Sequence, residues 1–261
     1  TLRDRISWNC IIGMYAQQGW VWEVLQVFRR MHQEEIPDKI TYISIMSAFT
    51  GDMALAYGKQ IHVQILCAQS EIIDASVETA LISMYGKLSS PENALCSFAK
   101  MPERTIVSWN AMITVCAEHG LIEEAFLFFC QIREKGMVLD KVSYVNIVNA
   151  LANREDPIES KQMHHLIVEE GFECVVDVAT ALIHMYGRCS CLDDARRIFN
   201  GMIERTCVTW NYMIRVYTTC YGEDVPAKQL FEQMKQEGVL SDKFIASSMI
   251  STYATKIALK E

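Results

Sequence analysis

One short segment of the sequence recurs at a constant interval of 101 residues, and this periodicity constrains the fold more than any other feature. Trp8, Trp109 and Trp210 are each preceded by Ser or Thr and followed by Asn. A fixed interval is typical of a repeat architecture, in which similar units stack along the chain. An interval of this length divides into several smaller units.

A second pattern subdivides the interval. A small residue is followed three, four and seven positions later by mostly apolar residues, as in Ala125, Phe128, Phe129 and Ile132. Residues with this spacing lie on one stripe of an α-helix. Further copies with an aromatic residue occupy 24–31, 94–101, 195–202 and 227–234, and copies with a histidine occupy 58–65 and 160–167.

Each stripe follows a helix that carries little charge, so the predicted unit is a helix-turn-helix hairpin. The boundaries fall at 5–38, 39–74, 75–105, 106–140, 141–175, 176–206 and 207–242, with a partial eighth unit at 243–261. The short third and sixth units contain 31 residues and the others 34 to 36, so a long-long-short triplet repeats. Stacked hairpins bury their stripes in one continuous core. We therefore predict an all-α fold, a single right-handed superhelical α-α solenoid over residues 1–261.

The formal net charge of −8 weighs against nucleic-acid binding through a basic surface. Charged residues are concentrated on the second helices and the turns, however. The segments 8–16, 42–50, 109–117, 144–152 and 178–186 of the first helices contain no Asp, Glu, Lys or Arg. We expect these helices to line the concave side of the solenoid and the excess acidic residues to lie on its convex side.

The composition argues against several other classes of protein. Ten cysteines are scattered through the helical patterns, which favours a reducing compartment over a disulfide framework. Cys189 and Cys191 have no second half-site at zinc spacing, so no metal site is predicted. No window of eighteen apolar residues occurs, so no membrane span is predicted. Residues 1–4 match the end of an internal unit at 102–105, and we expect the chain to be part of a longer protein.

Four motifs carry a resemblance to a known family. They are Val-Ser-Trp-Asn-Ala-Met-Ile at 107–113, Gly-Lys-Gln-Ile-His at 58–62, Ala-Leu-Ile-Ser-Met-Tyr-Gly-Lys at 80–87 and Met-Pro-Glu-Arg at 101–104. Over essentially its whole length the chain resembles the pentatricopeptide-repeat family, and in particular the plant organellar subclass that alternates ordinary, long and short repeats. The steady 34-residue period and Trp-Leu-Gly-Tyr pattern of tetratricopeptide repeats are absent.

The resemblance implies that each reading repeat binds one base of single-stranded RNA. The fifth residue of the first helix and the last residue of the repeat, here called the reader pair, hydrogen-bond the base, and the second residue, the wedge, packs beside it. In the three ordinary repeats the reader pairs are Asn9 with Asp38, Asn110 with Asp140 and Asn211 with Asp242, and the wedges are Ile6, Val107 and Val208. The family associates an Asn and Asp pair with uracil. Alternatively, each Asn is an ordinary polar residue near a helix end and each Asp caps the following helix.

The short repeats differ from this pattern. Their reader pairs are Thr79 with Thr105 and Thr180 with Thr206. A fifth-position Thr leans towards purines in the family, whereas a terminal Thr departs from the usual Asp or Asn. Asp177 also replaces the apolar wedge, which predicts a weak contact in that repeat.

Other positions have less direct roles. The long repeats carry Ile43 and Val145 at the fifth position, where they cannot hydrogen-bond a base, so these repeats are expected to be spacers or partner surfaces. Lys87 and Arg188 follow the first helices of the short repeats, where they can contact phosphate or remain solvated turn charges. His62 and His164 are interpreted as partly buried packing residues, because no Ser, Cys or carboxylate recurs in phase with them.

The resemblance implies sequence-specific binding of single-stranded RNA in a mitochondrion or chloroplast. The subclass with ordinary, long and short repeats further implies a role in cytidine-to-uridine editing or other transcript processing. Editing cofactor proteins are implied as partners of the long repeats. The sequence has neither the motifs of a zinc deaminase nor a clustered-aspartate nuclease site, so we predict no catalytic residue, no cofactor and no enzymatic activity. An alternative interpretation is a helical scaffold that binds a protein or peptide, which the acidic balance and the apolar fifth positions favour.

Overall fold

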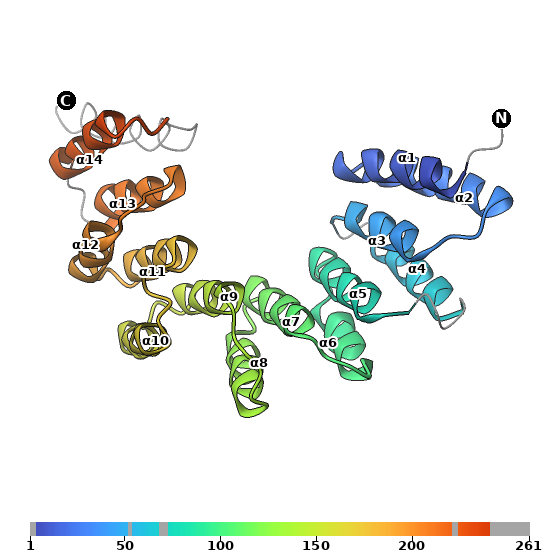
Figure 1. Cartoon of the computed structure of the whole chain (residues 1–261), viewed down its shortest axis with the longest axis horizontal. Coiled ribbons are helices and arrows are strands. Elements are labelled where there is room, and N and C mark those ends of the chain that lie inside the picture. The colour runs from blue at the N-terminus through green and yellow to red at the C-terminus, as the bar shows by residue number, and fades with distance from the viewer. Residues whose placement is uncertain (1–3, 52–53, 68–72, 221–223, 241–261) are drawn as a thin grey trace, which may run out of the picture. The chain divides into compact units, whose positions relative to one another are not determined.

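The computed structural model describes residues 4–51, 54–67, 73–220 and 224–240. These residues form fourteen α-helices joined by short turns, and no strand occurs among them (Figure 1). The predicted all-α class is therefore confirmed. The predicted partial repeat at 243–261 and the predicted reader Asp242 lie outside the described residues. Internal contacts group the chain into two units, residues 1–138 and 139–261.

The first unit contains four helical hairpins. Its first helices are α1 (Arg5–Gln17), α3 (Lys39–Ala48), α5 (Ala75–Lys87) and α7 (Ile106–Glu118), and its second helices are α2 (Val21–Glu34), α4 (Leu55–Cys67), α6 (Pro91–Lys100) and α8 (Ile122–Glu134). Helix α1 packs against α3, α3 against α5 and α5 against α7, so the first helices form a row (Figure 1). Each second helix packs against its own first helix.

The second unit repeats this arrangement. It contains α9 (Lys141–Ala152), α10 (Pro157–Glu169), α11 (Val176–Arg188), α12 (Leu192–Gly201), α13 (Cys207–Cys220) and α14 (Asp224–Gln236), with α11 packed between α9 and α13. In the two short repeats the second helices, α6 and α12, have 10 residues, whereas those of the other repeats have 13 or 14. The short repeats are therefore short mainly because their second helix loses about one turn.

In five of the repeats the last residue caps the first helix of the next, whereas Val175 makes no side-chain cap on α11. Asp38, Asp74 and Asp140 each accept a hydrogen bond from a backbone N–H in the first turn of the following helix. The hydroxyl oxygens of Thr105 and Thr206 accept equivalent bonds. Such caps satisfy backbone donors that the helix itself leaves unpaired. The capping role considered from the sequence is therefore present, and for Asp38 it coexists with a contact to Asn9 that is described below.

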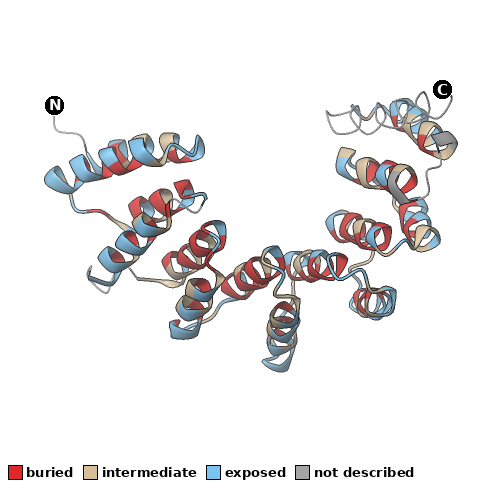
Figure 2. Cartoon of the chain, turned by 180° about the vertical axis from the view of Figure 1, so that it is seen from behind, coloured by how far each residue is buried: buried red, intermediate tan, exposed pale blue. Residues whose placement is uncertain are grey.

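The predicted stripes form the core. In α8, Ala125, Phe129 and Ile132 are buried and Phe128 is half-buried. Trp109 lies edge-on to Phe98 of the preceding hairpin, with ring centroids 4.7 Å apart at 74°, a favourable geometry for aromatic rings. Figure 2 shows the buried residues gathered on the faces where helices of one unit meet. These observations confirm that the stripe is a packing surface.

The two histidines that replace an aromatic residue in the stripe form hydrogen bonds between helices, and the bond is partly buried for His62 and buried for His164. The Nδ1 atom of His62 lies 2.8 Å from the hydroxyl oxygen of Tyr85, and that of His164 lies 2.9 Å from the hydroxyl oxygen of Tyr186. Each bond joins the second helix of a long repeat to the first helix of the short repeat that follows. Burial lowers the pKa of both histidines, and this outweighs the opposite effect of Glu173 on the pKa of His164.

We expect the contribution of these two histidines to stability to fall as the pH drops below about 6.5. The folded chain holds the pKa of both histidines below the ordinary value of 6.5, so the unfolded chain binds protons more readily at these pH values. Their contribution is complete above pH 6.5 and is lost as the pH falls through that value towards the lowered pKa. Thermal unfolding should show a flatter pH profile for the His62→Asn, His164→Asn double variant, whose amides do not titrate. If the pH profiles of wild type and the double variant run parallel, these two histidines do not cause the loss of stability.

Candidate nucleic-acid interface

The wedge positions are exposed although they are apolar. The exposed fractions of Ile6, Val107 and Val208 are 72%, 61% and 51%. The same position in the long repeats holds Ile40 and Val142, which are also exposed. Single exposed apolar residues are common, but their recurrence at one position of five of the seven described first helices indicates a contact surface. The sequence interpretation overlooked Ile40 and Val142, although their phase with the other wedges was a usable signal.

The first predicted reader pair is in direct contact. The amide Nδ2 of Asn9 donates a hydrogen bond to Oδ1 of Asp38 at 3.2 Å, although the two residues are 29 positions apart. The hydroxyl oxygen of Thr41 lies 2.7 Å from Oδ1 of Asn9 and 2.9 Å from Oδ1 of Asp38. The packing of α3 on α1 thus brings together a reader pair and a third residue, Thr41, that the sequence interpretation did not single out.

The surroundings of Asp38 keep its carboxylate charged. Partial burial acts to raise the pKa of Asp38, but the hydrogen bonds from Thr41 and Asn9, together with the Arg5 charge, hold it below its usual value. The Arg5 guanidinium nitrogen Nη1 lies 4.0 Å from Oδ2 of Asp38. The bonds among Asn9, Asp38 and Thr41 use Oδ1 of the carboxylate and one amide hydrogen. Oδ2, which faces the Arg5 guanidinium at 4.0 Å, and the second amide hydrogen of Asn9 take part in none of these three bonds.

A similar cluster occurs in the second unit. The hydroxyl oxygen of Thr180 lies 2.8 Å from that of Thr209, which in turn lies 3.0 Å from that of Thr206. The predicted pair of Thr180 with Thr206 is therefore linked through Thr209, the third residue of α13. Sequence reasoning missed Thr209 as it missed Thr41.

The other short repeat is arranged differently. The Thr79 hydroxyl donates to the carbonyl oxygen of Ala75 in its own helix at 2.6 Å. The Ser108 hydroxyl, at the position equivalent to Thr209, donates to the carbonyl oxygen of Thr105 at 2.9 Å. Both bonds are local to one helix or its cap, and neither links Thr79 to Thr105. The two short repeats, alike in sequence, thus present their fifth residue differently.

A cavity of about 440 Å³ lies among α9, α11 and α13, and we call it the α9/α11/α13 groove. Its volume is within the range of small-molecule sites. Its lining combines the wedge and reader positions of three successive repeats, namely Val142, Val145, Asp177, Thr180, Thr206 and Val208. Lys141 also lines it, and its ammonium nitrogen lies 2.7 Å from Oδ2 of Asp177. The charge that replaces a wedge in this repeat is therefore paired with a lysine.

The remaining predicted residues occupy varied surroundings. Asn110 is buried in the first unit, while Asp140 caps α9 in the second. Asn211 is half-buried. Lys87 is exposed at the end of α5, and Arg188 forms an ion pair with Glu155. A phosphate contact by Arg188 would therefore have to compete with this glutamate.

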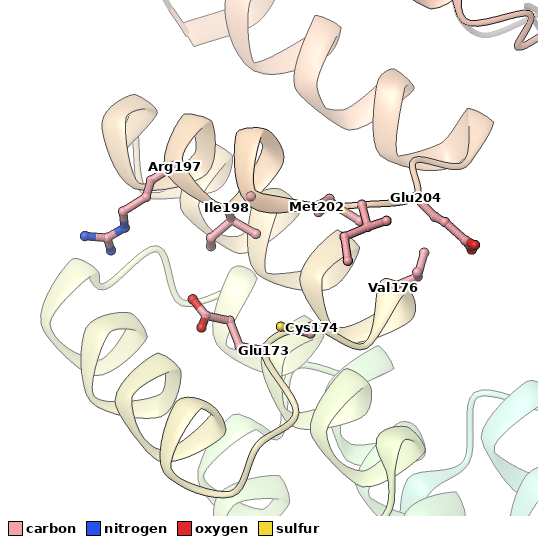
Figure 3. A pocket seen from close by; sticks show the side chains of 9 residues that line it. Glu173, Cys174, Val176, Arg197, Ile198, Met202 and Glu204 are labelled. Atoms are coloured by element: carbon pink, nitrogen blue, oxygen red, sulfur yellow. The ribbon is translucent and has the colours of Figure 1, made fainter.

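A second cavity, of about 500 Å³, lies beside α12. Figure 3 shows Glu173, Cys174 and Val176 on one side of it and Ile198 and Met202 on the other. None of the predicted reader or wedge residues lines it. Among the described residues, no group of three or more metal-ligating side chains is placed to hold an ion. In the same part of the chain no helix is long and apolar enough to cross a membrane.

Stacked helical hairpins with phased exposed wedges define a solenoid repeat protein, and comparisons with known proteins identify its family. Models of the PPR repeat match residues 6–36, 79–106 and 178–207, and a model of the PPR repeat family matches 104–153. A pentatricopeptide repeat-containing protein of Arabidopsis thaliana is 32% identical over 95% of this chain and 28% of its own length. A chloroplastic one from the same plant is 33% identical over 97% of this chain and 31% of its own length. The chain belongs to the pentatricopeptide repeat (PPR) family.

Solved structures agree on the fold. The crystal structure of the pentatricopeptide repeat protein PPR10 from maize matches with a TM-score of 0.83 and 19% identity, over 97% of this chain and 37% of that one. PPR10 in complex with an 18-nt psaJ RNA element matches with a TM-score of 0.80 and 18% identity, over 97% and 38%. The chain thus spans about a third of the length of these relatives. The likeness confirms the predicted solenoid class.

Proposed function

We propose that this chain binds single-stranded RNA sequence-specifically in a chloroplast or mitochondrion, one base per reader repeat. The observation that carries the proposal is the bonded pair of Asn9 and Asp38, which stands beside the exposed wedge Ile6 on the same helix. The structure of PPR10 with RNA supports RNA as the ligand, and the chloroplastic relative supports an organelle as the compartment. Single-stranded bases expose both an edge for hydrogen bonds and a face for apolar packing.

The chemistry of the first reader pair fits uracil. The second amide hydrogen of Asn9 is a donor, and Oδ2 of Asp38 is an acceptor. Uracil presents a carbonyl oxygen beside an N–H on its Watson–Crick edge and satisfies both groups, whereas cytosine presents an amino group in place of that oxygen and guanine presents the same pair on a larger ring. Ile6 then packs against the ring. We extend this reading to Asn110 with Asp140 and to Asn211 with Asp242, and we propose purines for the Thr79 and Thr180 repeats.

The alternation of long and short repeats supports membership of the plant organellar subclass with ordinary, long and short repeats. We propose that the chain recognises sites for cytidine-to-uridine editing or for other transcript processing. The chemical step would be supplied by another domain or protein, and editing cofactor proteins would bind the long repeats.

Binding titrations with short RNAs test the proposal. We expect an RNA of pattern U-N-R-U-N-R-U, with the N-terminal repeat towards the 5′ end, to bind more tightly than versions with G at the U positions. Each mismatch should cost roughly 1–3 kcal/mol, as other lost base contacts do. Changes at the N positions, which face the long repeats, serve as the matched control and should leave affinity nearly unchanged. Equal affinity for U and G versions, or no binding, would overturn the proposal.

A protein or peptide partner is the second candidate, and the α9/α11/α13 groove favours it. Val142 and Val145 line this groove and make it apolar without adding a group that reads a base edge. A peptide held there would make the affinity for RNA insensitive to base identity at the position facing Thr180. Titration with RNAs that differ only at this position, the second R of the pattern, therefore distinguishes the two candidates.

A further inference from the structure

The third residue of a first helix carries a buried hydroxyl in several repeats. Thr41, Ser108, Ser143 and Thr209 each have an exposed fraction of 0%. A hydroxyl removed from water costs free energy unless it finds hydrogen-bond partners. The identity of those partners therefore indicates why the hydroxyl is there.

The Thr41 hydroxyl accepts a hydrogen bond from the Asp38 backbone N–H at 3.2 Å, as part of the N-terminal cap of α3, and it also contacts the reader of the preceding repeat. This hydroxyl is 2.7 Å from Oδ1 of Asn9, while Nδ2 of Asn9 is 3.2 Å from the Asp38 carboxylate. Reversing the Asn9 amide would place its oxygen against that carboxylate and would withdraw the acceptor from Thr41. The network therefore holds the amide in one orientation, with an N–H rather than a carbonyl oxygen left for a ligand.

The hydroxyl of Thr209 likewise contacts the reader of the preceding repeat, Thr180. It lies 2.8 Å from the Thr180 hydroxyl and 3.0 Å from the Thr206 hydroxyl. A threonine side chain rotates between staggered positions, and a partner on the next helix favours one of them. Thr180 and Thr209 are thus coupled across the interface of α11 and α13.

The long repeats provide an internal contrast. Where the fifth residue is apolar, as in Ile43 and Val145, the third residue of the next first helix is Val77 or Val178. Both valines have an exposed fraction of 0%. Valine has nearly the shape of threonine, so packing at this position does not require a hydroxyl. Among the described first helices the hydroxyl accompanies polar readers and is absent behind apolar ones, whereas the sequence has Ile245 at the position that follows the reader Asn211.

We propose that Thr41 and Thr209 are positioning residues that set the base preference of the preceding repeat by orienting Asn9 and Thr180. This inference rests on the proposed RNA-binding function. It does not extend to Ser108, whose hydroxyl bonds the Thr105 carbonyl oxygen instead. Specificity in this chain is therefore a property of two adjacent repeats, not of one.

The test compares Thr41→Val and Thr41→Ser in the full chain. Thr41→Val is expected to fold, because Val77 and Val178 occupy the equivalent buried position. With RNA, wild type should prefer U over C, whose amino group would face the amide hydrogen of Asn9, at the 5′ position by roughly 5- to 150-fold. Thr41→Val should bring the ratio at the 5′ position close to one and leave the ratio at the central U unchanged. Thr41→Ser should keep the wild-type ratio at the 5′ position. An unchanged 5′ ratio in Thr41→Val would overturn the proposal.

A second measurement separates this inference from the proposed function. Nuclear magnetic resonance of the Asn9 side-chain amide reports its orientation and mobility without RNA. Thr41→Val should make this amide mobile, and Thr41→Ser should leave it ordered. Failure of wild type to bind RNA would overturn the proposed function and, with it, the role in base choice. An equally ordered amide in wild type and Thr41→Val would overturn the positioning role itself.

Discussion

Replacing Gly187 with alanine is expected to lower the free energy of unfolding by about 1–3 kcal/mol. A Cβ at this position would overlap the Cγ2 methyl of Val216, where α11 packs against α13. Val216 is buried, and a β-branched side chain in a helix has almost no alternative rotamer. The two helices would have to separate, and this outweighs the helix propensity that alanine adds. Chemical denaturation measures the loss.

Two further variants make this prediction specific. Adding Val216→Ala to Gly187→Ala should recover part of the loss, because it removes the methyl group that alanine meets. Gly13→Ala is the matched control, since nothing lies within 4 Å of a Cβ built there. It should stabilise the chain by about 0.5–1 kcal/mol, as alanine does in helix interiors. A Gly187→Ala chain as stable as wild type would show that α11 and α13 are not so closely packed.

Changing Asn110 to Thr is expected to switch the preferred base at the central position from U to G. Asn110 occupies the fifth position of α7, and its replacement removes an amide donor and leaves space for a larger purine ring. We expect the ratio of affinities for the two RNAs to change by roughly 1–3 kcal/mol. Titrations of wild type and variant with RNAs that differ only at the central position measure this ratio.

The control for this exchange is Asn200→Thr, the same substitution at an exposed position of the second helix α12. It should leave the preference for U intact. If Asn110→Thr retains the preference of wild type, the fifth residue is not the reader in this repeat. If both variants lose binding equally, the effect is not one of base choice.

Much of the fold is predictable from the sequence because its signals are local. The i, i+3, i+4, i+7 stripe of Ala125 to Ile132 predicts a helix and its buried face together. The Asp and Thr residues at repeat ends mark helix starts because they satisfy backbone donors within three residues. The proposed wedge and reader positions then follow from the phase of the repeat, and Asn9 and Asp38 lie in contact.

The roles of Thr41 and Thr209 are not predictable in this way. Each hydroxyl accepts a local bond from the backbone N–H at the end of the preceding repeat and also bonds a residue 29 to 32 positions away on a neighbouring helix, and periodicity indicates only the local bond. The exposure of Ile40 and Val142 likewise depends on which face α3 and α9 turn outwards.

The sequence by itself determined the all-α class, the helix starts and the phase of the candidate reading positions, because periodicity and capping act over one or two turns of a helix. Only the tertiary structure decided how each reader is held. Thr79 and Thr180 are the same residue at the same repeat position, yet Thr79 bonds its own helix and Thr180 bonds the next. The difference arises because a side-chain hydroxyl takes the best-placed acceptor around it, and packing between repeats sets that placement.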